Sequence, residues 1–329
     1  MNSPTGAGVP RVMAAIAAGR ARELDGRGVN CSYRLMHAGR PLSVKVHCPD
    51  RSSDVERRRI QSVDAALRGT DWYPPVIDMG MYAAEQPHLV VIRPFVPGER
   101  SADARGHIGR LLDVISDLSV LAPSGDAVGE DLTWDYATPW LTDAEHESRY
   151  AHRIRTGEWA HLARAVAVHA QDLLDSAERL TRAERPVVHH GDLHGGNLIH
   201  HGSRPLTVVD WDETGFSRRP ADAAKALWLS CRRGRGDFVM DAAAVRHFLL
   251  RMHAQLHIPY AAMGDVAKLG AIWFLPRNDH VALIERRNPA FGPWYLDWVS
   301  RFWSRFEQNL QVISDSAAIL EGNEGRRRP

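Results

Sequence analysis

The chain has 329 residues, of which 44% are apolar and 25% are charged. These values are ordinary for a globular protein, and the length exceeds what one small core needs. The formal net charge of +1 gives no global field that would attract a nucleic acid or a membrane surface. The three cysteines are widely spaced and form no CxxC pair, which argues against a disulfide framework or structural zinc and favours a reducing cytoplasm.

We expect neither a signal peptide nor a membrane span in this sequence. The first residues are rich in proline, glycine and serine, and no apolar stretch follows a basic start, so we expect no signal peptide. No run of 18 apolar residues occurs, so we expect no membrane span. Residues 1–10 and 321–329 are predicted to be loose termini.

The first third of the chain predicts a small mixed α/β unit. Alternating apolar residues predict strands over 32–36 and 42–46 around a turn at 37–41. Residues 53–68 have the apolar spacing of a charged helix, and 89–92 form a short buried strand.

Two prolines and a glycine interrupt regular structure within residues 93–98. We therefore predict an N-terminal domain over residues 1–92, a hinge over 93–98 and a second domain over 99–320. The second domain is mostly helical, with helices predicted over 103–121, 159–182, 221–233, 240–256, 262–274 and 293–314.

A polar loop between two hydrophobic strands carries the chemistry. The first strand begins at Val187, a turn is predicted over 200–205, and the second strand covers 206–209. Asp192, Asn197 and Asp210 stand in or beside this loop. Their hard oxygen atoms suit magnesium and can accept a hydroxyl proton, which is the help that phosphoryl transfer needs from a protein.

Residues 190–197, HGDLHGGN, resemble the H-G-D-x-x-x-x-N catalytic loop of the aminoglycoside phosphotransferase and choline kinase group. Residues 208–211, VVDW, resemble the metal motif of the same group, which stands where protein kinases have D-F-G. The resemblance implies an α+β, protein-kinase-like bilobal fold, with a small N-terminal β-sheet lobe that carries a helix and a larger, mainly helical C-terminal lobe.

The same resemblance implies ATP and Mg²⁺ as cofactors and gives each residue of the motif a role. Asp192 is the expected catalytic base, and His190 braces the loop. Asn197 and Asp210 are the expected magnesium ligands. A loop in which Asp192 and Asn197 only cap turns is the simpler alternative.

The group's nucleotide site is matched more weakly. Residues 26–33 resemble its nucleotide loop, with Gly28 and Asn30 beside the phosphates, although Arg27, Val29 and Cys31 depart from the usual small or polar residues. Glycine turns are common, so this segment alone would carry little weight.

Lys45 ends an alternating strand, as does the lysine that pairs the ATP phosphates in this group. Glu56 on the following helix is its candidate partner, and Asp64 competes for that role. Arg93 and Phe95 lie within the expected hinge over residues 93–98, where the resemblance implies that backbone groups hold adenine.

Residues 220–224, PADAA, resemble the group's D-L-A segment, in which an aspartate hydrogen-bonds the catalytic loop. Asp222 is therefore expected to support the loop, and a plain helix N-cap is the alternative. The adjacent Gly195 and Gly196 replace a Pro-Gly pair that is frequent in the group.

The acceptor is less well determined. Asp212 and Glu213 could hold a cationic amine beside the acceptor hydroxyl, although capping or surface charge would also explain them. Arg277 and Asp279 are further acceptor candidates, because they interrupt an apolar run. The aromatic residues between Trp273 and Phe306 are expected to be mainly core, with a minority lining the acceptor pocket. The clustered histidines contain no HExxH pattern, so zinc catalysis is not favoured.

The leading hypothesis is an ATP-dependent O-phosphotransferase that modifies a hydroxyl of an antibiotic, such as an aminoglycoside or aminocyclitol, in resistance or secondary metabolism. A metabolic kinase for choline, homoserine or a sugar is the alternative enzyme, and a nucleotide-binding module without turnover is the alternative from another class. The partner is a small-molecule acceptor, without nucleic acid or membrane, and the chain is expected to be a cytoplasmic monomer or homodimer.

Overall fold

The computed structural model describes residues 8–25, 29–100, 105–122, 132–142, 159–181, 185–201, 204–234 and 236–326. The chain divides into two compact units. The first contains Met1–Arg100, Ser124–Leu132 and Leu198–Val209, and the second contains Ser101–Pro123, Thr133–Asn197 and Asp210–Pro329. The sheet-rich first unit and the mostly helical second unit give the α+β architecture predicted from the sequence.

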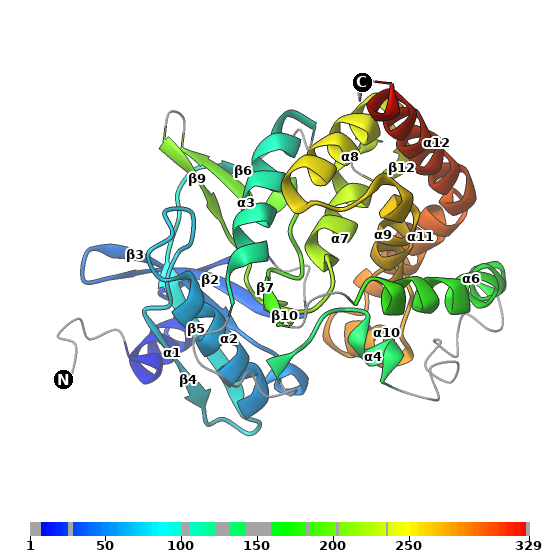
Figure 1. Cartoon of the computed structure of the whole chain (residues 1–329). Coiled ribbons are helices and arrows are strands. Elements are labelled where there is room, and N and C mark those ends of the chain that lie inside the picture. The colour runs from blue at the N-terminus through cyan, green and yellow to red at the C-terminus, as the bar shows by residue number, and fades with distance from the viewer. Residues whose placement is uncertain are drawn as a thin grey trace. The chain divides into compact units, whose positions relative to one another are not determined.

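The first unit is built on a five-stranded antiparallel sheet in the order β1-β2-β3-β5-β4 (Figure 1). Alternate residues of its strands face opposite sides, so Val90 and Ile92 join one buried cluster and Leu89 and Val91 another. The strands predicted at 32–36, 42–46 and 89–92 are confirmed as β2, β3 and β5. The five strands are β1 (Ala21–Asp25), β2 (Cys31–His37), β3 (Arg40–Val46), β4 (Asp78–Tyr82) and β5 (His88–Pro94).

Two helices belong to this unit. The predicted helix at 53–68 is confirmed as α2 (Asp54–Leu67), whose first turn is capped because the Ser53 hydroxyl accepts a hydrogen bond from the Glu56 amide. The sequence analysis did not predict α1 (Val9–Ala17), which packs Val9, Val12 and Ala15 into the core of the sheet. Residues 9 and 10 are therefore helical, not part of a loose terminus.

A second sheet of the first unit joins β6 (Glu99–Arg100), β8 (Leu198–His201) and β9 (Arg204–Val208) in the order β6-β8-β9. The turn predicted over residues 200–205 is too long, because β8 runs to His201 and β9 begins at Arg204. The first unit also takes in residues 198–209, which the predicted boundaries placed in the second domain.

The second unit consists mainly of helices, with two short antiparallel ribbons, β7 with β10 and β11 with β12. The ribbons are β7 (Val187–His189), β10 (Gly215–Ser217), β11 (Arg232–Gly234) and β12 (Asp237–Met240). The helices are α3 (Ile108–Val120), α4 (Thr138–Leu141), α6 (Ala160–Arg179), α7 (Ala221–Ser230), α8 (Ala242–Leu256), α9 (Met263–Ile272), α10 (Asn278–Arg287), α11 (Phe291–Trp303) and α12 (Phe306–Gly325). Short 3₁₀ turns cover η1 (Pro49–Arg51), η2 (Arg105–His107), η5 (Gly195–Asn197) and η6 (Tyr260–Ala262).

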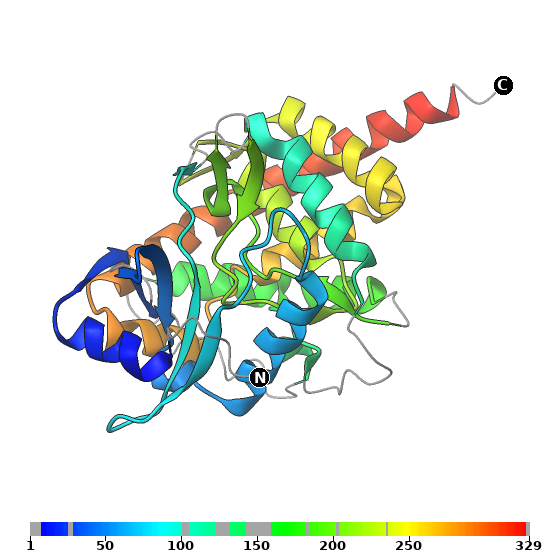
Figure 2. The same ribbon diagram turned by 90° about the vertical axis from the view of Figure 1, so that its left-hand side faces the viewer.

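Helix α7 lies at the centre of the second unit, and all ten of its residues are buried (Figure 1). Helix α9 packs closely on it because Gly270 has no side chain: a Cβ there would overlap the carbonyl oxygen of Ala224. The indole of Trp228 donates a hydrogen bond to the Ala267 carbonyl at 2.7 Å and fixes the pairing. Helices α3 and α8 pack side by side in this unit, as Figures 1 and 2 both show.

Two predictions at the C-terminal end are wrong. The single helix predicted over 293–314 is two helices, α11 and α12, which are separated at Ser304 and Arg305. The predicted loose tail from residue 321 is helical to Gly325, because α12 continues that far. No glycine or proline stands at the break, so the apolar spacing gave no stop signal.

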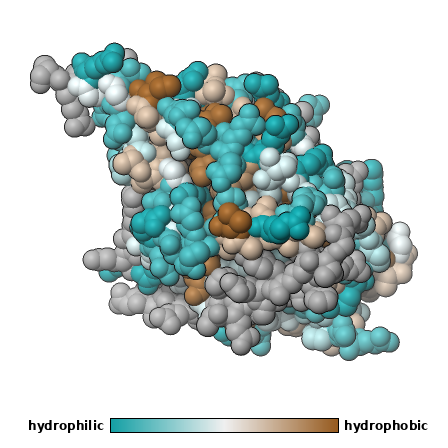
Figure 3. Space-filling model, turned by 90° about the vertical axis from the view of Figure 1, so that its right-hand side faces the viewer, coloured by the Kyte–Doolittle hydropathy of each residue, from teal (hydrophilic) through white to brown (hydrophobic). Residues whose placement is uncertain are grey.

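No helix in the described part of the chain is long and apolar enough to cross a membrane. On the face drawn in Figure 3, hydrophobic side chains form separate small spots between hydrophilic ones.

Candidate active site

The catalytic loop leaves β7, whose pairing with β10 places His189 opposite Gly215. Gly191 follows with a φ of 81°, a left-handed conformation that favours glycine. A Cβ at this position would also overlap the carbonyl oxygen of Glu213. The glycine of the HGD motif is therefore needed for the close approach of the loop to the segment after Asp210.

Asp222, in the first turn of α7, holds the backbone of this loop. Its two carboxylate oxygens accept hydrogen bonds from the amides of His190 at 2.7 Å and Gly191 at 2.9 Å. Burial alone would raise the pKa of Asp222, but His189, His190 and the His190 amide stabilise the charged form and hold the pKa below its usual value. The supporting role predicted for Asp222 is confirmed. The N-cap alternative is wrong, because the capping position is Pro220.

Lys225, one turn further along α7, reaches the same loop. Its ammonium lies 2.7 Å from Asp192 Oδ1 and donates a hydrogen bond to the Gly191 carbonyl at 3.0 Å. Glu213 Oε2 is 3.9 Å away, and the ring centroid of Trp273 is 3.7 Å away. Lys225 was not among the site residues predicted from the sequence.

Asp192, the predicted base, is partly accessible, with 28% of its side chain exposed. Its Oδ2 lies 3.3 Å from Asn197 Nδ2 and 3.7 Å from His194 Nε2. Burial alone would raise the pKa of Asp192, but the Lys225 ammonium and His194 hold that pKa well below its usual value. The carboxylate is therefore ionised and positioned to accept a hydrogen bond from a hydroxyl.

His190 is fully buried and contacts the loop. Its Nδ1 accepts a hydrogen bond from the Asp192 amide at 3.2 Å, and its ring packs on Trp211 at a centroid distance of 4.4 Å. This side chain contacts the backbone of the base.

The predicted magnesium ligands have suitable donor atoms. Asn197 donates from Nδ2 to the Asp192 carbonyl at 2.8 Å, which orients its amide oxygen away from that bond. Asp210 is exposed and adopts a φ of 68°, an uncommon conformation for a residue other than glycine. A carboxylate and an amide oxygen are ligands that magnesium accepts, so these residues fit the ion that the resemblance implies.

The described residues contain no cluster of three His, Cys, Asp or Glu side chains that could hold a metal. The clustered histidines have other contacts where the structure describes them. His189 Nε2 lies 2.7 Å from the Trp134 carbonyl oxygen, and His194 Nδ1 accepts a hydrogen bond from the Gly196 amide.

The acceptor candidates are brought together only in part. Glu213 lies near Lys225 and therefore close to the base. Asp212 follows directly in the chain and is half-buried. Arg277 precedes α10, and Asp279 lies on α10 with a side chain outside the described residues. Their roles in acceptor binding stay predictions.

The predicted nucleotide residues of the first unit have structural partners of their own. Lys45 lies on β3, opposite Ser32 on one side and Val91 on the other. Glu56 lies 3.4 Å from His47 Nδ1 and 3.8 Å from Arg59. The pairing of Glu56 with Lys45 therefore stays a prediction.

Asp64 was the alternative candidate for the partner of Lys45. Its carboxylate accepts hydrogen bonds from the Tyr73 hydroxyl at 2.9 Å and the Val76 amide at 2.7 Å. Arg93 donates to the same hydroxyl at 2.7 Å and to the Pro74 carbonyl at 2.6 Å.

Asn30 accepts a hydrogen bond from the Cys48 amide at 3.0 Å, so it ties the segment before β2 to the end of β3. The Phe95 amide donates to the Pro41 carbonyl, and the Arg34 guanidinium lies 4.5 Å from the Phe95 ring. Gly28 lies outside the described residues. The nucleotide-binding roles of these residues stay predictions.

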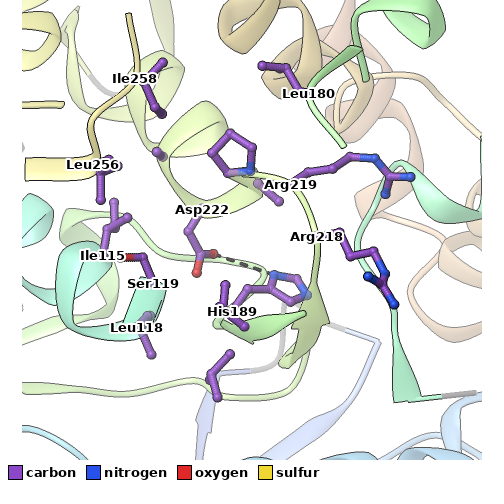
Figure 4. Close-up of a pocket in the computed structure, with 15 residues that line it drawn as sticks. Ile115, Leu118, Ser119, Leu180, His189, Arg218, Arg219, Asp222, Leu256 and Ile258 are labelled. Atoms are coloured by element: carbon purple, nitrogen blue, oxygen red, sulfur yellow. Dashed lines mark ion pairs between the residues drawn. The ribbon is translucent and has the colours of Figure 1, made fainter. Parts of the chain in front are cut away.

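A cavity of about 240 Å³ lies behind the catalytic loop and is lined mainly by apolar side chains of α3, α7 and neighbouring segments (Figure 4). Asp222 and His189 form part of its wall, and His189 Nδ1 lies 3.9 Å from Asp222 Oδ1. Asp192 and Asn197 are not among its lining residues, so the catalytic carboxylate does not face this cavity.

A signal for Lys225 was present in the sequence. It is the only charged residue besides Asp222 in the segment ADAAKALWLS, where the other eight residues are alanine, leucine, tryptophan or serine. The two charged residues are three positions apart, so both lie on one face of a helix. A lysine in a buried helix needs a partner, and the nearby catalytic carboxylate is the obvious candidate.

Comparison with known proteins supports the assignment made from this geometry. The model of the APH phosphotransferase enzyme family matches residues 21–257, and the chain belongs to that family. No curated protein sequence matches the chain.

Several solved structures are similar in fold. A microcompartment-associated aminopropanol kinase has a TM-score of 0.64 at 19% identity, over 92% of this chain and 98% of that one. Spectinomycin phosphotransferase APH(9)-Ia, solved with ADP and spectinomycin, has a TM-score of 0.54 at 12% identity, over 90% and 92%. An ethanolamine kinase from Plasmodium vivax has a TM-score of 0.55 at 12% identity, over 89% and 84%.

The fold is thus the protein-kinase-like fold of this family. Family membership and the loop geometry together make the protein an ATP-dependent phosphotransferase that acts on a hydroxyl group of a small molecule.

Proposed function

We propose that this phosphotransferase uses ATP and Mg²⁺ to phosphorylate a hydroxyl of an antibiotic or a related natural product, in resistance or secondary metabolism. The observation that carries the proposal is the carboxylate of Asp192, ionised and partly exposed at the end of the HGD motif.

In the proposed reaction, Asp192 accepts a hydrogen bond from the acceptor hydroxyl and orients its oxygen toward the γ-phosphorus of ATP. A new bond forms between that oxygen and the phosphorus, and the bond from the phosphorus to the oxygen that bridges to the β-phosphate breaks. ADP leaves, and the hydroxyl proton passes to Asp192. Asn197 and Asp210 would hold Mg²⁺, which neutralises phosphate charge when it is bound.

The choice of an antibiotic as acceptor is supported by the acidic pair that follows the metal motif. Asp212 and Glu213 could attract a cationic acceptor such as an aminoglycoside or an aminocyclitol. The fold similarity to a spectinomycin phosphotransferase and to an aminoglycoside phosphotransferase from Alicyclobacillus acidocaldarius agrees with this choice. We propose that the protein works in the cytoplasm as a monomer or homodimer.

A metabolic amino-alcohol kinase is the second candidate. The aminopropanol kinase gives a TM-score of 0.64, and an ethanolamine kinase is also similar in fold. Such acceptors also carry an ammonium group near the hydroxyl, so the same acidic residues would serve them.

The test is a coupled assay of ADP release with ATP and Mg²⁺ across antibiotics, amino alcohols and sugars. We expect turnover with one acceptor class, and its loss in Asp192→Asn. Asp315→Asn, the same substitution at an exposed position of α12, is the matched control and should keep full activity. Turnover of an amino alcohol with high kcat/KM, and of no antibiotic, would replace the first candidate by the second. Thermal stabilisation by ATP without any acceptor-dependent turnover would contradict both.

A further inference from the structure

Lys225 is a fully buried lysine in the central helix of the second unit. Burial of an ammonium group is costly unless partners replace its water shell. A well-packed apolar side chain at such a position is often as stabilising as a buried ion pair, or more so. Stability of the fold is therefore a weak reason for a lysine here, and a role in the site is a stronger one.

The Lys225 ammonium has a favourable contact for each of its three N–H groups. Asp192 Oδ1 at 2.7 Å and the Gly191 carbonyl at 3.0 Å account for two of its three N–H groups. The third side is covered by the face of Trp273, at 3.7 Å from the ring centroid, and Glu213 Oε2 lies 3.9 Å away. A cation over an indole face is itself a favourable contact. The lysine is therefore held in one place, and its charge is directed at the base.

Asp222 and Lys225 act on consecutive residues of the loop. Asp222 accepts hydrogen bonds from the amides of His190 and Gly191, and Lys225 contacts the Gly191 carbonyl and the Asp192 carboxylate. Their spacing of three residues puts both side chains on one face of α7. The backbone of the loop already has its support from Asp222, so the distinct contribution of Lys225 is its contact with the side chain of Asp192.

We propose that Lys225 is a positioning residue of the phosphoryl transfer, which fixes Asp192 through Oδ1 and leaves Oδ2 to receive the acceptor hydroxyl. Oδ2 lies on the side of Asn197 and His194, at 3.3 and 3.7 Å. The exposure of the two side chains fits this division, because Asp192 is 28% exposed and Lys225 is not exposed. Lys225 itself touches no reacting atom.

Loss of such a contact should affect the rate more than nucleotide binding. A misplacement of a catalytic group by about 1 Å can cost about 10²-fold in rate. We expect Lys225→Met, which keeps the length and removes the charge, to lower kcat by about 10²-fold with little change in the KM for ATP. Lys225→Arg keeps the charge but changes its shape, and should recover part of the loss.

Charge rescue separates positioning from packing. In Lys225→Ala, added n-propylammonium can occupy the space of the missing side chain and should raise kcat in a saturable way. n-Propanol has a similar size and no charge, and should not raise it. Lys268→Met is the matched control, because Lys268 on α9 forms an ion pair with Asp172 away from the loop. Wild-type kcat in folded Lys225→Met, or equal rescue by both additives, would overturn the proposal.

This inference rests on the proposed function, so a second measurement is needed that requires no acceptor. Thermal unfolding of Asp192→Asn, Lys225→Met and the double variant forms a double-mutant cycle. Asp192→Asn leaves the ammonium without its carboxylate and should lower Tm by about 5 °C or more. Adding Lys225→Met should recover part of that loss.

Strictly additive changes in Tm would overturn the pairing, whatever the kinetics. If Lys225→Met does not fold, Lys225→Gln, which also lacks the charge, takes its place in both experiments, and wild-type kcat in that variant would also contradict the proposal. A coupled cycle without ADP release for any acceptor, or for water as acceptor, would support the pair and count against the proposed function instead.

Discussion

The charged residues of the catalytic loop are held by one helix, whereas those around Lys45 are divided between a strand and a helix of the first unit. In the loop, Asp222 of α7 accepts hydrogen bonds from the amides of residues 190–191, and Lys225 of α7 forms an ion pair with Oδ1 of Asp192. In the first unit, Glu56 of α2 lies beside His47 and Arg59.

The comparison shows two ways of preparing a site. The catalytic carboxylate has an oriented cation beside it and a supported backbone, which lowers the reorganisation needed during the reaction. In the first unit, the Glu56 carboxylate lies 3.4 Å from His47 Nδ1 and 3.8 Å from Arg59 Nη2. Changes in the loop should therefore reduce the rate most, and changes around Lys45 should act mainly on ATP binding.

The largest effect is expected for Asp192→Asn. It should lower kcat by about 10²-fold or more, because the proton acceptor and the orientation of the hydroxyl are lost together. The protein should remain folded, with a lower Tm. The measurement is steady-state ADP release together with circular dichroism, and wild-type turnover would refute the role of Asp192.

Asp135 supports the strand ribbon before the loop and should give the largest effect on stability. It is buried, lies 2.8 Å from Arg219 Nη1 and accepts a hydrogen bond from the Ser217 hydroxyl at 2.7 Å. Asp135→Asn leaves Arg219 without its charged partner and should lower the free energy of unfolding by about 3 kcal/mol at pH 7. Asp113→Asn removes an exposed ion pair with Arg251 and should cost less than about 1 kcal/mol.

The effect of Asp135→Asn should depend on pH. Burial alone would raise the pKa of Asp135, but Arg219, Ser217 and His189 hold it below its usual value. A lowered folded-state pKa favours folding while the carboxylate is ionised, so its contribution is present above about pH 4 and is lost as the pH falls further. The stability difference between wild type and Asp135→Asn should therefore shrink between about pH 5 and pH 3 in denaturant titrations. A constant stability difference between wild type and Asp135→Asn over that pH range would contradict the lowered pKa of Asp135.

The catalytic loop could be predicted from the sequence because its parts are neighbours in the chain. Asp192, Asn197 and Asp210 fall within 19 residues, and short strands on either side fix their spacing. The sheet of the first unit was predictable for a similar reason, since alternation along β2 and β3 follows directly from burial of one face.

The partners of Asp192 could not be predicted in the same way. Lys225 reaches Asp192 because α7 packs against the loop. The position of α7 depends in turn on its contacts with α9: Gly270 of α9 allows a close approach, and Trp228 of α7 donates a hydrogen bond to α9. The distance between Lys225 and Asp192 depends on how several helices pack, and the periodicity of apolar residues in the sequence does not define that packing. The break between α11 and α12 was missed because its residues match a continuous helical pattern.

A smaller effect is expected at the proposed metal ligand. Asp210→Ala removes one carboxylate ligand and should raise the Mg²⁺ concentration for half-maximal activity by about tenfold. The measurement is the Mg²⁺ dependence of the rate of ADP release at saturating ATP, with Asp315→Asn as control. An unchanged dependence would remove Asp210 from the ligand set.

Lys45→Met tests the first unit directly. A charged hydrogen bond to a phosphate contributes about 1.5–3 kcal/mol, so its loss should raise the KM for ATP by about tenfold or more. kcat should change less than in Asp192→Asn. A large fall in kcat with an unchanged KM would show that Lys45 acts in the chemical step, and the contrast between the two regions would then fail.

The smallest effect is expected for Glu56→Gln. The carboxylate lies 3.4 Å from His47 Nδ1 and 3.8 Å from Arg59 Nη2, and these contacts are the ones that Glu56→Gln should weaken. We expect the KM for ATP to change by less than about threefold, which corresponds to less than about 0.7 kcal/mol. Asp54→Asn, at an exposed position of the same helix, is the control. If Glu56→Gln instead raised KM as much as Lys45→Met, Glu56 would be the partner of Lys45 in the ATP complex.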